Sequence, residues 1–123
     1  IGEYGDTTAR SPWENKPVEA IRFNEGKLEW SLVDESAMED MVRVLMFGSK
    51  KYSPDNWKKG MQVKAIYDSL RRHQAAFMAG EDNDPESGLP HTGHILCNAM
   101  FLAWMVKNKP EFDNRLTKTN NVN

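Results

Sequence analysis

The chain has 123 residues, a formal net charge of −2 at pH 7 and a sequence pI of about 5.9. This length supports one hydrophobic core, and the near-neutral charge excludes the broad basic surface that binds duplex nucleic acid. A single cysteine, Cys97, excludes an internal disulfide and fits a reducing compartment, for which we expect the cytoplasm. The longest apolar run, residues 95–106, is interrupted by Asn98 and is too short to span a membrane, so we expect no membrane partner.

The chain order predicts an irregular lead-in over residues 1–17, one helical domain over residues 18–107 and a polar tail over residues 108–123. Near the start of the domain, apolar residues alternate with polar ones on both sides of Asn24-Glu25-Gly26. This alternation predicts a short hairpin or an extended segment over residues 20–33.

Three helices are predicted after this segment. The first starts near Asp34, where a side-chain cap is available, and ends at Gly48. The second covers residues 63–79, and the third runs from residue 90 or 91 to about residue 107. A short acidic turn joins the second and third helices, which predicts a helical hairpin. We therefore expect an all-α fold, a small antiparallel bundle.

The apolar positions of these helices predict how they are buried. Residues Met38, Met41, Val42, Leu45 and Met46 form the apolar face of the first helix, and Val63, Ile66, Tyr67, Leu70 and Phe77 form that of the second. The third helix is apolar nearly all round, which is typical of a helix in the core or in a subunit interface. Three helices make a thin core, so we expect oligomerisation, as a homodimer or homotetramer, to complete the bundle.

A row of polar residues interrupts the apolar third helix. His91, His94 and Asn98 are spaced i, i+3, i+7 and share one face. Buried polar groups need partners, and His73 lies on the preceding antiparallel helix. The turn between the two helices adds four carboxylates: Glu81, Asp82, Asp84 and Glu86. Carboxylates and imidazoles at this spacing predict a divalent-metal site. The simpler alternative is turn chemistry at Asp84 and structural roles for the histidines.

Basic and aromatic residues form a second group. Arg22 and Lys27 bracket the predicted hairpin turn, and four lysines (Lys50, Lys51, Lys58 and Lys59) bracket Tyr52, Asn56 and Trp57. Lysine and arginine neutralise phosphates, aromatic rings stack on a base, and asparagine reads a base edge. This composition predicts a nucleotide site, and the alternative is a solvated basic loop.

Three long segments of the sequence resemble a known family: RFNEGKLEW, MFGSKKYSPDNWKKG and LRRHQAAFMAGEDNDPESGLPHTGHILCNAMFL. They are similar to the phage-encoded dATP/dGTP diphosphohydrolases, also called MazZ-like, within the all-α, MazG-like nucleoside triphosphate pyrophosphohydrolases. The similarity covers about residues 20–105. It implies that a purine deoxynucleoside triphosphate is cleaved to the monophosphate and pyrophosphate with Mg²⁺ or Mn²⁺, in the host cytoplasm if the protein is phage-encoded.

The chain departs from the wider group in its metal motifs. That group carries Glu-Glu-x-x-Glu on one helix and Glu-x-x-Asp on a later one. Here His91-Thr-Gly-His94 stands where Glu-x-x-Asp is expected, Glu81-Asp-Asn-Asp84 is an alternative match, and Glu39-Asp40 is the nearest counterpart of the earlier motif. The expected metal ligands are Glu39, Glu81, Asp84, Glu86, His91 and His94.

The resemblance also implies roles for other residues. The expected catalytic residues, which orient or deprotonate the attacking water, are His73, Glu81 and Asp84. The expected substrate-binding residues are Arg22, Lys27, Lys50, Lys51, Tyr52, Asn56, Trp57 and Asn98. Two other classes fit the same residues: another metal-dependent phosphohydrolase, such as a zinc enzyme of the histidine-aspartate type, and a nucleotide-binding module without activity. No histidine here is followed by aspartate, which argues against the zinc class.

Overall fold

The structure, a computed structural model, describes residues 17–115 in two compact units that meet in sequence between Trp30 and Ser31. In the first unit, residues 17–30 are mainly extended, with one turn in which the Lys27 N–H donates to the Asn24 carbonyl over 3.0 Å. Gly26 supplies the positive φ, +80°, that this turn requires. No strand forms among the described residues, so the extended segment is found and the hairpin is not.

The second unit is helical, and its α-helices and 3₁₀ turns are distributed along the whole of its described length. In chain order they are η2 (Trp30–Leu32, at the junction with the first unit), η3 (Glu35–Met38), α1 (Glu39–Lys51), η4 (Asn56–Lys59), α2 (Val63–Met78), α3 (His91–Asn108) and η5 (Pro110–Phe112). The predicted all-α bundle is confirmed. In the part of the chain that is described, no helix has the length and apolar character needed to cross a membrane.

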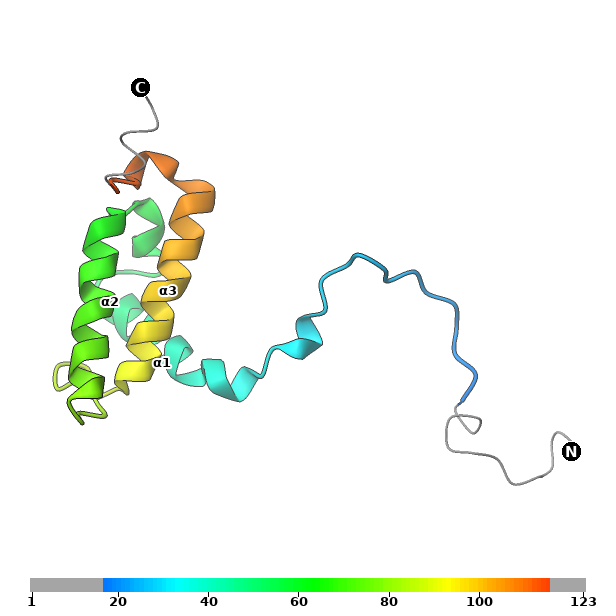
Figure 1. Cartoon of the computed structure of the whole chain (residues 1–123), viewed down its shortest axis with the longest axis horizontal. Helices are drawn as coiled ribbons and strands as arrows, with labels where there is room; N and C mark the ends of the chain where they lie inside the picture. The colour runs from blue at the N-terminus through cyan, green and yellow to red at the C-terminus, as the bar shows by residue number, and fades with distance from the viewer. Residues whose placement is uncertain (1–16, 116–123) are drawn as a thin grey trace, which may run out of the picture. The chain divides into compact units, whose positions relative to one another are not determined.

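Helix α3 is the central element of this bundle, because both α1 and α2 pack against it (Figure 1). α2 and α3 run side by side in opposite directions, as the predicted helical hairpin requires. Gly93 allows a close approach to α1, since a Cβ at this position would lie 2.8 Å from the backbone oxygen of Asp40. The start of α3 is therefore seated tightly on the first turn of α1.

The first helix differs from its prediction in where it ends and in which side chains it buries. Asp34 caps η3, because its Oδ1 accepts from the Ser36 N–H over 2.9 Å. The helix that follows does not end at Gly48; α1 continues to Lys51, because Gly48 keeps a helical backbone and the lysines after it favour the negative end of the helix dipole. Its buried side is centred on Met41 and Val44, whereas the predicted Val42 and Met46 are exposed.

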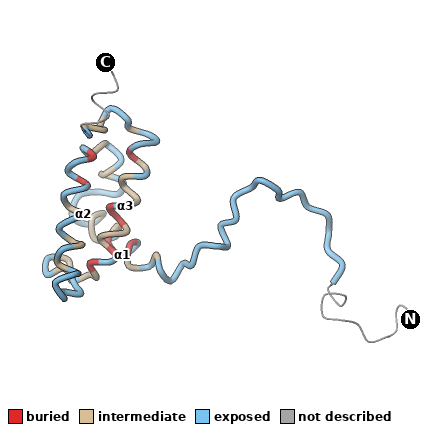
Figure 2. Tube along the Cα trace, viewed as in Figure 1, coloured by how far each residue is buried: buried red, intermediate tan, exposed pale blue. Residues whose placement is uncertain are grey.

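The core consists of two small clusters along α3, and Figure 2 shows the buried positions within the helices. One contains Met41, Val44 and Cys97, and the other contains Val63, Ile66 and Met105. Phe101 packs against both clusters and joins them. Burial raises the pKa of the Cys97 thiol to about 12, so this cysteine is the buried apolar residue that its sequence context predicts.

Candidate active site

The acidic turn between α2 and α3 is held in one conformation by its own backbone. The Asp84 N–H donates to the Leu89 carbonyl over 2.8 Å, and the Gly88 N–H donates to the Asp84 carbonyl over 2.7 Å. The His91 N–H donates to the Asp82 carbonyl over 2.8 Å, which ties the turn to the first residue of α3. The polar side chains of this turn are therefore placed against the helix start by backbone hydrogen bonds, and Leu89 adds apolar packing against the core.

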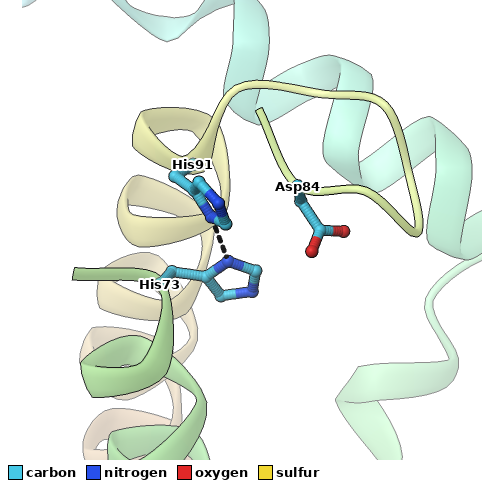
Figure 3. Close-up of side chains that lie close together, drawn as sticks. All are labelled: His73, Asp84 and His91. Carbon is cyan, nitrogen blue, oxygen red and sulfur yellow. Dashed lines mark hydrogen bonds between the residues drawn. The ribbon is translucent and has the colours of Figure 1, made fainter. Parts of the chain in front are cut away.

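Three side chains from three different segments meet at this end of the bundle: His73 of α2, Asp84 of the turn and His91 of α3 (Figure 3). One nitrogen or oxygen from each lies within 4.8 Å of the other two. The Nδ1 atoms of His73 and His91 are 2.9 Å apart. Two ring nitrogens at this distance need either a proton between them or a cation that both coordinate.

Glu81 fixes the orientation of the His91 ring. His91 Nε2 and Glu81 Oε1 are 2.7 Å apart, and because a carboxylate only accepts, Nε2–H is the donor. The Nδ1 lone pair of the neutral His91 ring is then turned toward His73 and Asp84. A carboxylate on the far nitrogen is the usual partner of a metal-binding histidine.

Ser87 connects Asp84 with His94. Both the N–H and the hydroxyl of Ser87 donate to Asp84 Oδ2 over 3.0 Å. Since the single hydroxyl proton is used in this way, His94 Nε2–H donates to Ser87 Oγ over 2.7 Å. The His94 ring also stacks on the His73 ring, with centroids 4.3 Å apart and planes 5° from parallel. His94 thus supports two of the three members of the cluster, His73 by stacking and Asp84 through Ser87.

The environment favours the protonation states that bind cations. Burial, followed by the neighbouring His94, lowers the pKa of His73, and burial also lowers the pKa of His94. Burial acts to raise the pKa of Asp84, but the hydrogen bonds from Ser87 and the nearby histidines outweigh it and lower that pKa. A neutral His73 ring next to an ionised Asp84 carboxylate offers a lone pair and a negative charge to a cation, which is the chemistry of a divalent-metal site.

A cavity of about 660 Å³ opens beside the cluster, within the size range of small-molecule sites. Asp84, Glu86 and His94 line its end nearest the turn. Arg72 of α2 and Lys51 of α1 add positive charge to its wall. Charged groups of both signs beside a nonpolar interior suit a ligand that carries both phosphates and a ring.

The structure gathers most, but not all, of the predicted metal and catalytic residues. His73, His91 and Glu81 form one hydrogen-bonded group, Asp84 and His94 form a second through Ser87, and the stacked rings of His73 and His94 join the two. Glu86 lies at the cavity and pairs instead with Lys51, over 2.7 Å. Glu39 is exposed on the first turn of α1, 3.8 Å from Arg43, and is outside the candidate cluster.

The predicted substrate-binding residues are also divided. Lys51, Tyr52, Asn56, Trp57 and Asn98 line the cavity. Lys50 is exposed near the end of α1 and is not among the lining residues, and Arg22 and Lys27 belong to the first unit.

Trp57 is engaged by other aromatic rings, since its ring centroid lies 4.7 Å from that of Phe101 and 5.0 Å from that of Trp104. Trp57 is therefore packed against α3 and is not part of a fully solvated loop.

Sequence reasoning did not single out Ser87, Ser69 or Arg72. The spacing Asp84-x-x-Ser87, typical of a side-chain-capped turn, was the available signal for Ser87. Ser69 and Arg72 become visible only when α2 is placed against α3, because both are polar and lie outside the apolar positions from which the buried face of this helix was predicted.

Comparisons with known proteins show which family the chain resembles. Residues 18–115 match the family described as dATP/dGTP diphosphohydrolase, N-terminal. A curated protein from Salmonella phage PMBT28, named dATP/dGTP diphosphohydrolase, is 36% identical over 95 residues, which cover 77% of this chain and 32% of that protein. The chain thus spans about a third of the length of this relative, and no solved structure matches it. The chain belongs to the family of dATP/dGTP diphosphohydrolase N-terminal domains.

Proposed function

We propose that this chain hydrolyses purine deoxynucleoside triphosphates, dATP or dGTP, to the monophosphate and pyrophosphate with the help of a divalent metal ion. The observation that carries the proposal is the cluster of His73, Asp84 and His91 at the edge of a ligand-sized cavity. The name of the phage relative supplies the substrate class.

His73, Asp84 and His91 would hold the ion, with Glu81 behind His91. When bound, a divalent ion neutralises phosphate oxygens and makes a water molecule more acidic. The expected ions are Mg²⁺ and Mn²⁺, and two imidazoles favour Mn²⁺, because Mg²⁺ prefers oxygen ligands.

The remaining residues divide the work of phosphate binding and proton transfer. Lys51 and Arg72 face the cavity and balance the charge of the triphosphate. Water adds to the α-phosphorus, the bond to the α–β bridging oxygen breaks, and its electron pair leaves with pyrophosphate. Glu81 or Asp84, with His73 as the third candidate, takes the proton of the water.

Product analysis tests this proposal directly. A panel of dNTPs and NTPs is incubated with Mg²⁺ or Mn²⁺ and separated by ion-exchange chromatography. We expect dGMP and dAMP with equimolar pyrophosphate, and we expect no product after chelation. Release of inorganic phosphate, or of intact triphosphate with a free nucleoside, would contradict the proposal.

A second metal-dependent phosphohydrolase class is favoured by one observation, the set of two imidazoles and one carboxylate, which also suits Zn²⁺. The two classes separate by product. A zinc phosphohydrolase of the histidine-aspartate type would release triphosphate or inorganic phosphate, whereas the proposed reaction releases pyrophosphate.

We further propose that the chain acts as a homodimer or homotetramer in the host cytoplasm. The support is the apolar surface that the helices leave exposed: Val42 and Met46 of α1 and Val106 of α3 are each about half exposed. Light scattering at micromolar concentration tests this proposal, and a monomer would contradict it.

A further inference from the structure

Asn98 is a buried polar residue whose side chain is only partly used by the protein. It is 8% exposed and lies on the same face of α3 as His91 and His94. It also lines the cavity, about 10 Å along the helix axis from His91 at 1.5 Å per residue. Asn98 is therefore placed deeper along α3 than the cluster that the proposed function assigns to the metal.

The hydrogen bonds of Asn98 leave one atom free. Its Nδ2 donates to the His94 carbonyl over 3.0 Å and to Ser69 Oγ over 3.4 Å. An atom this close to a carbonyl oxygen must be the amide nitrogen, so the other terminal atom is the oxygen, Oδ1. Within residues 17–115, no group donates to Oδ1. The Ser69 hydroxyl, which accepts from Asn98, likewise has no acceptor of its own in this range.

Among the described residues no fully buried side-chain nitrogen or oxygen lacks a hydrogen-bond partner, so the unpaired Asn98 Oδ1 reaches open space, where a ligand can donate to it. Buried polar side chains in proteins nearly always have partners, and the cavity is the open space beside Asn98. Asn98 Oδ1 and the Ser69 hydroxyl together present an acceptor next to a donor. The edges of nucleobases present the complementary pair, an amino or ring N–H next to a carbonyl oxygen or ring nitrogen.

We infer that Asn98 and Ser69 form the subsite that binds the base edge of the nucleotide. This inference rests on the proposed function and adds an orientation: the triphosphate lies at the start of α3, and the base lies one to two turns further along. The aromatic interior beyond Asn98, formed by Phe101 and Trp57, then borders the base. Recognition of the base edge thus falls on the two helices of the hairpin, and the basic loop contributes the ring of Trp57 beside the base.

The test compares two ligands that differ in whether they carry a base. Calorimetry with Mn²⁺ measures the binding of dGTP, supplied as its non-hydrolysable α,β-methylene analogue, and of inorganic tripolyphosphate to the full chain, to Asn98→Leu and to Ser69→Ala. Asn108→Leu is the matched control, because Asn108 makes the same type of bond to the carbonyl four residues before it, over 3.1 Å, but is exposed near the end of α3. Thermal melting checks that each variant folds.

We expect Asn98→Leu to weaken dGTP binding about tenfold and Ser69→Ala to weaken it about threefold, the effects of one or two lost hydrogen bonds. Tripolyphosphate binding should stay within about twofold of the parental value in both, and Asn108→Leu should change neither ligand. Unchanged dGTP binding, or an equal loss for both ligands, would overturn the inference while leaving the proposed reaction intact. A parental chain that binds neither ligand with Mn²⁺ would instead overturn the proposed function and this inference with it.

Discussion

The two halves of α3 are buried by different means. In its first two turns, His91 and His94 are held by Glu81 and Ser87, and Gly93 allows the backbone to touch α1. In its second half, Phe101, Trp104 and Met105 pack on aromatic and aliphatic side chains. The first half also contributes Leu96 and Cys97 to the apolar cluster with α1, but its histidines depend on polar partners, which a binding site needs.

This difference predicts that stability and chemistry are separable along one helix. Changes in the first half should lower metal binding and turnover with small effects on folding. Changes in the second half should lower the free energy of unfolding with small effects on the chemistry of molecules that remain folded. The four predictions below test this separation.

The largest effect is expected for His91→Ala. The substitution removes a proposed metal ligand. Its hydrogen-bond partner, Glu81, is already half exposed, so water can replace the lost contact and we expect the metal site to be affected more than the core. Turnover of dGTP should fall more than about a hundredfold, beyond the range typical of residues behind a ligand, while helical circular dichroism is retained. Thr92→Ala, an exposed neighbour in the same turn, is the control. Near-parental turnover in His91→Ala would show that His91 is not part of the site.

Trp57→Ala tests the second half of α3, because the Trp57 ring packs against Phe101 and Trp104 of that helix. The lost contacts with Phe101 and Trp104 should reduce the free energy of unfolding by about 2–3 kcal/mol, less than for a fully buried tryptophan because Trp57 is half-buried. A melting temperature about 10–20 °C lower would report this change. The exposed Trp30→Ala is the control and should melt like the parent. An unchanged melting temperature with a raised KM for dGTP would show that Trp57 serves the base instead.

Glu81→Gln probes the group behind His91. An amide can still accept from His91 Nε2–H, but it has no charge with which to increase the basicity of the ring. Mn²⁺ affinity should fall about tenfold to a hundredfold, and calorimetry measures it. Asp82→Asn, at the adjacent exposed position, should leave the affinity unchanged. A similar loss in both variants would point to the net charge of the turn and not to the Glu81–His91 contact.

The smallest effect concerns Cys97. With its pKa near 12, the thiolate makes up about 1 in 10,000 of the thiol at pH 8, and the side chain is buried. Alkylation by iodoacetamide should therefore be slow in the folded chain and fast in urea, as mass spectrometry can follow. Rapid labelling without denaturant would show that α1 and α3 separate readily.

The sequence predicted the fold well where a pattern repeats over several turns. The positions of α2 and α3 depended on such patterns and on Gly80, and they are confirmed within about one residue. The end of α1 depended on Gly48 alone, and a glycine that keeps a helical backbone does not stop a helix. The alternation near Asn24 could not distinguish a hairpin from an extended segment, because strand pairing depends on contacts that a local pattern does not encode.

For the site, the sequence indicated which residues come together but not what each one contacts. The spacing of His73, the acidic turn and His91 placed them at one end of the hairpin. Whether Glu81 is a ligand or a partner of His91 depends on side-chain geometry of a few ångströms, which spacing does not determine. Ser87 was missed for the same reason, since its role follows from the exact fold of the turn.

The central claim is that His73, Asp84 and His91 together hold a divalent ion at the start of α3. Titration of Mn²⁺, followed by the electron paramagnetic resonance signal of the free ion, tests it in the parental chain, in His73→Ala and in Glu39→Ala. The account predicts a site that His73→Ala abolishes and that Glu39→Ala leaves intact, because Glu39 is exposed beside Arg43 and outside the cluster. Parental affinity in His73→Ala, or loss of the site in Glu39→Ala, would contradict it.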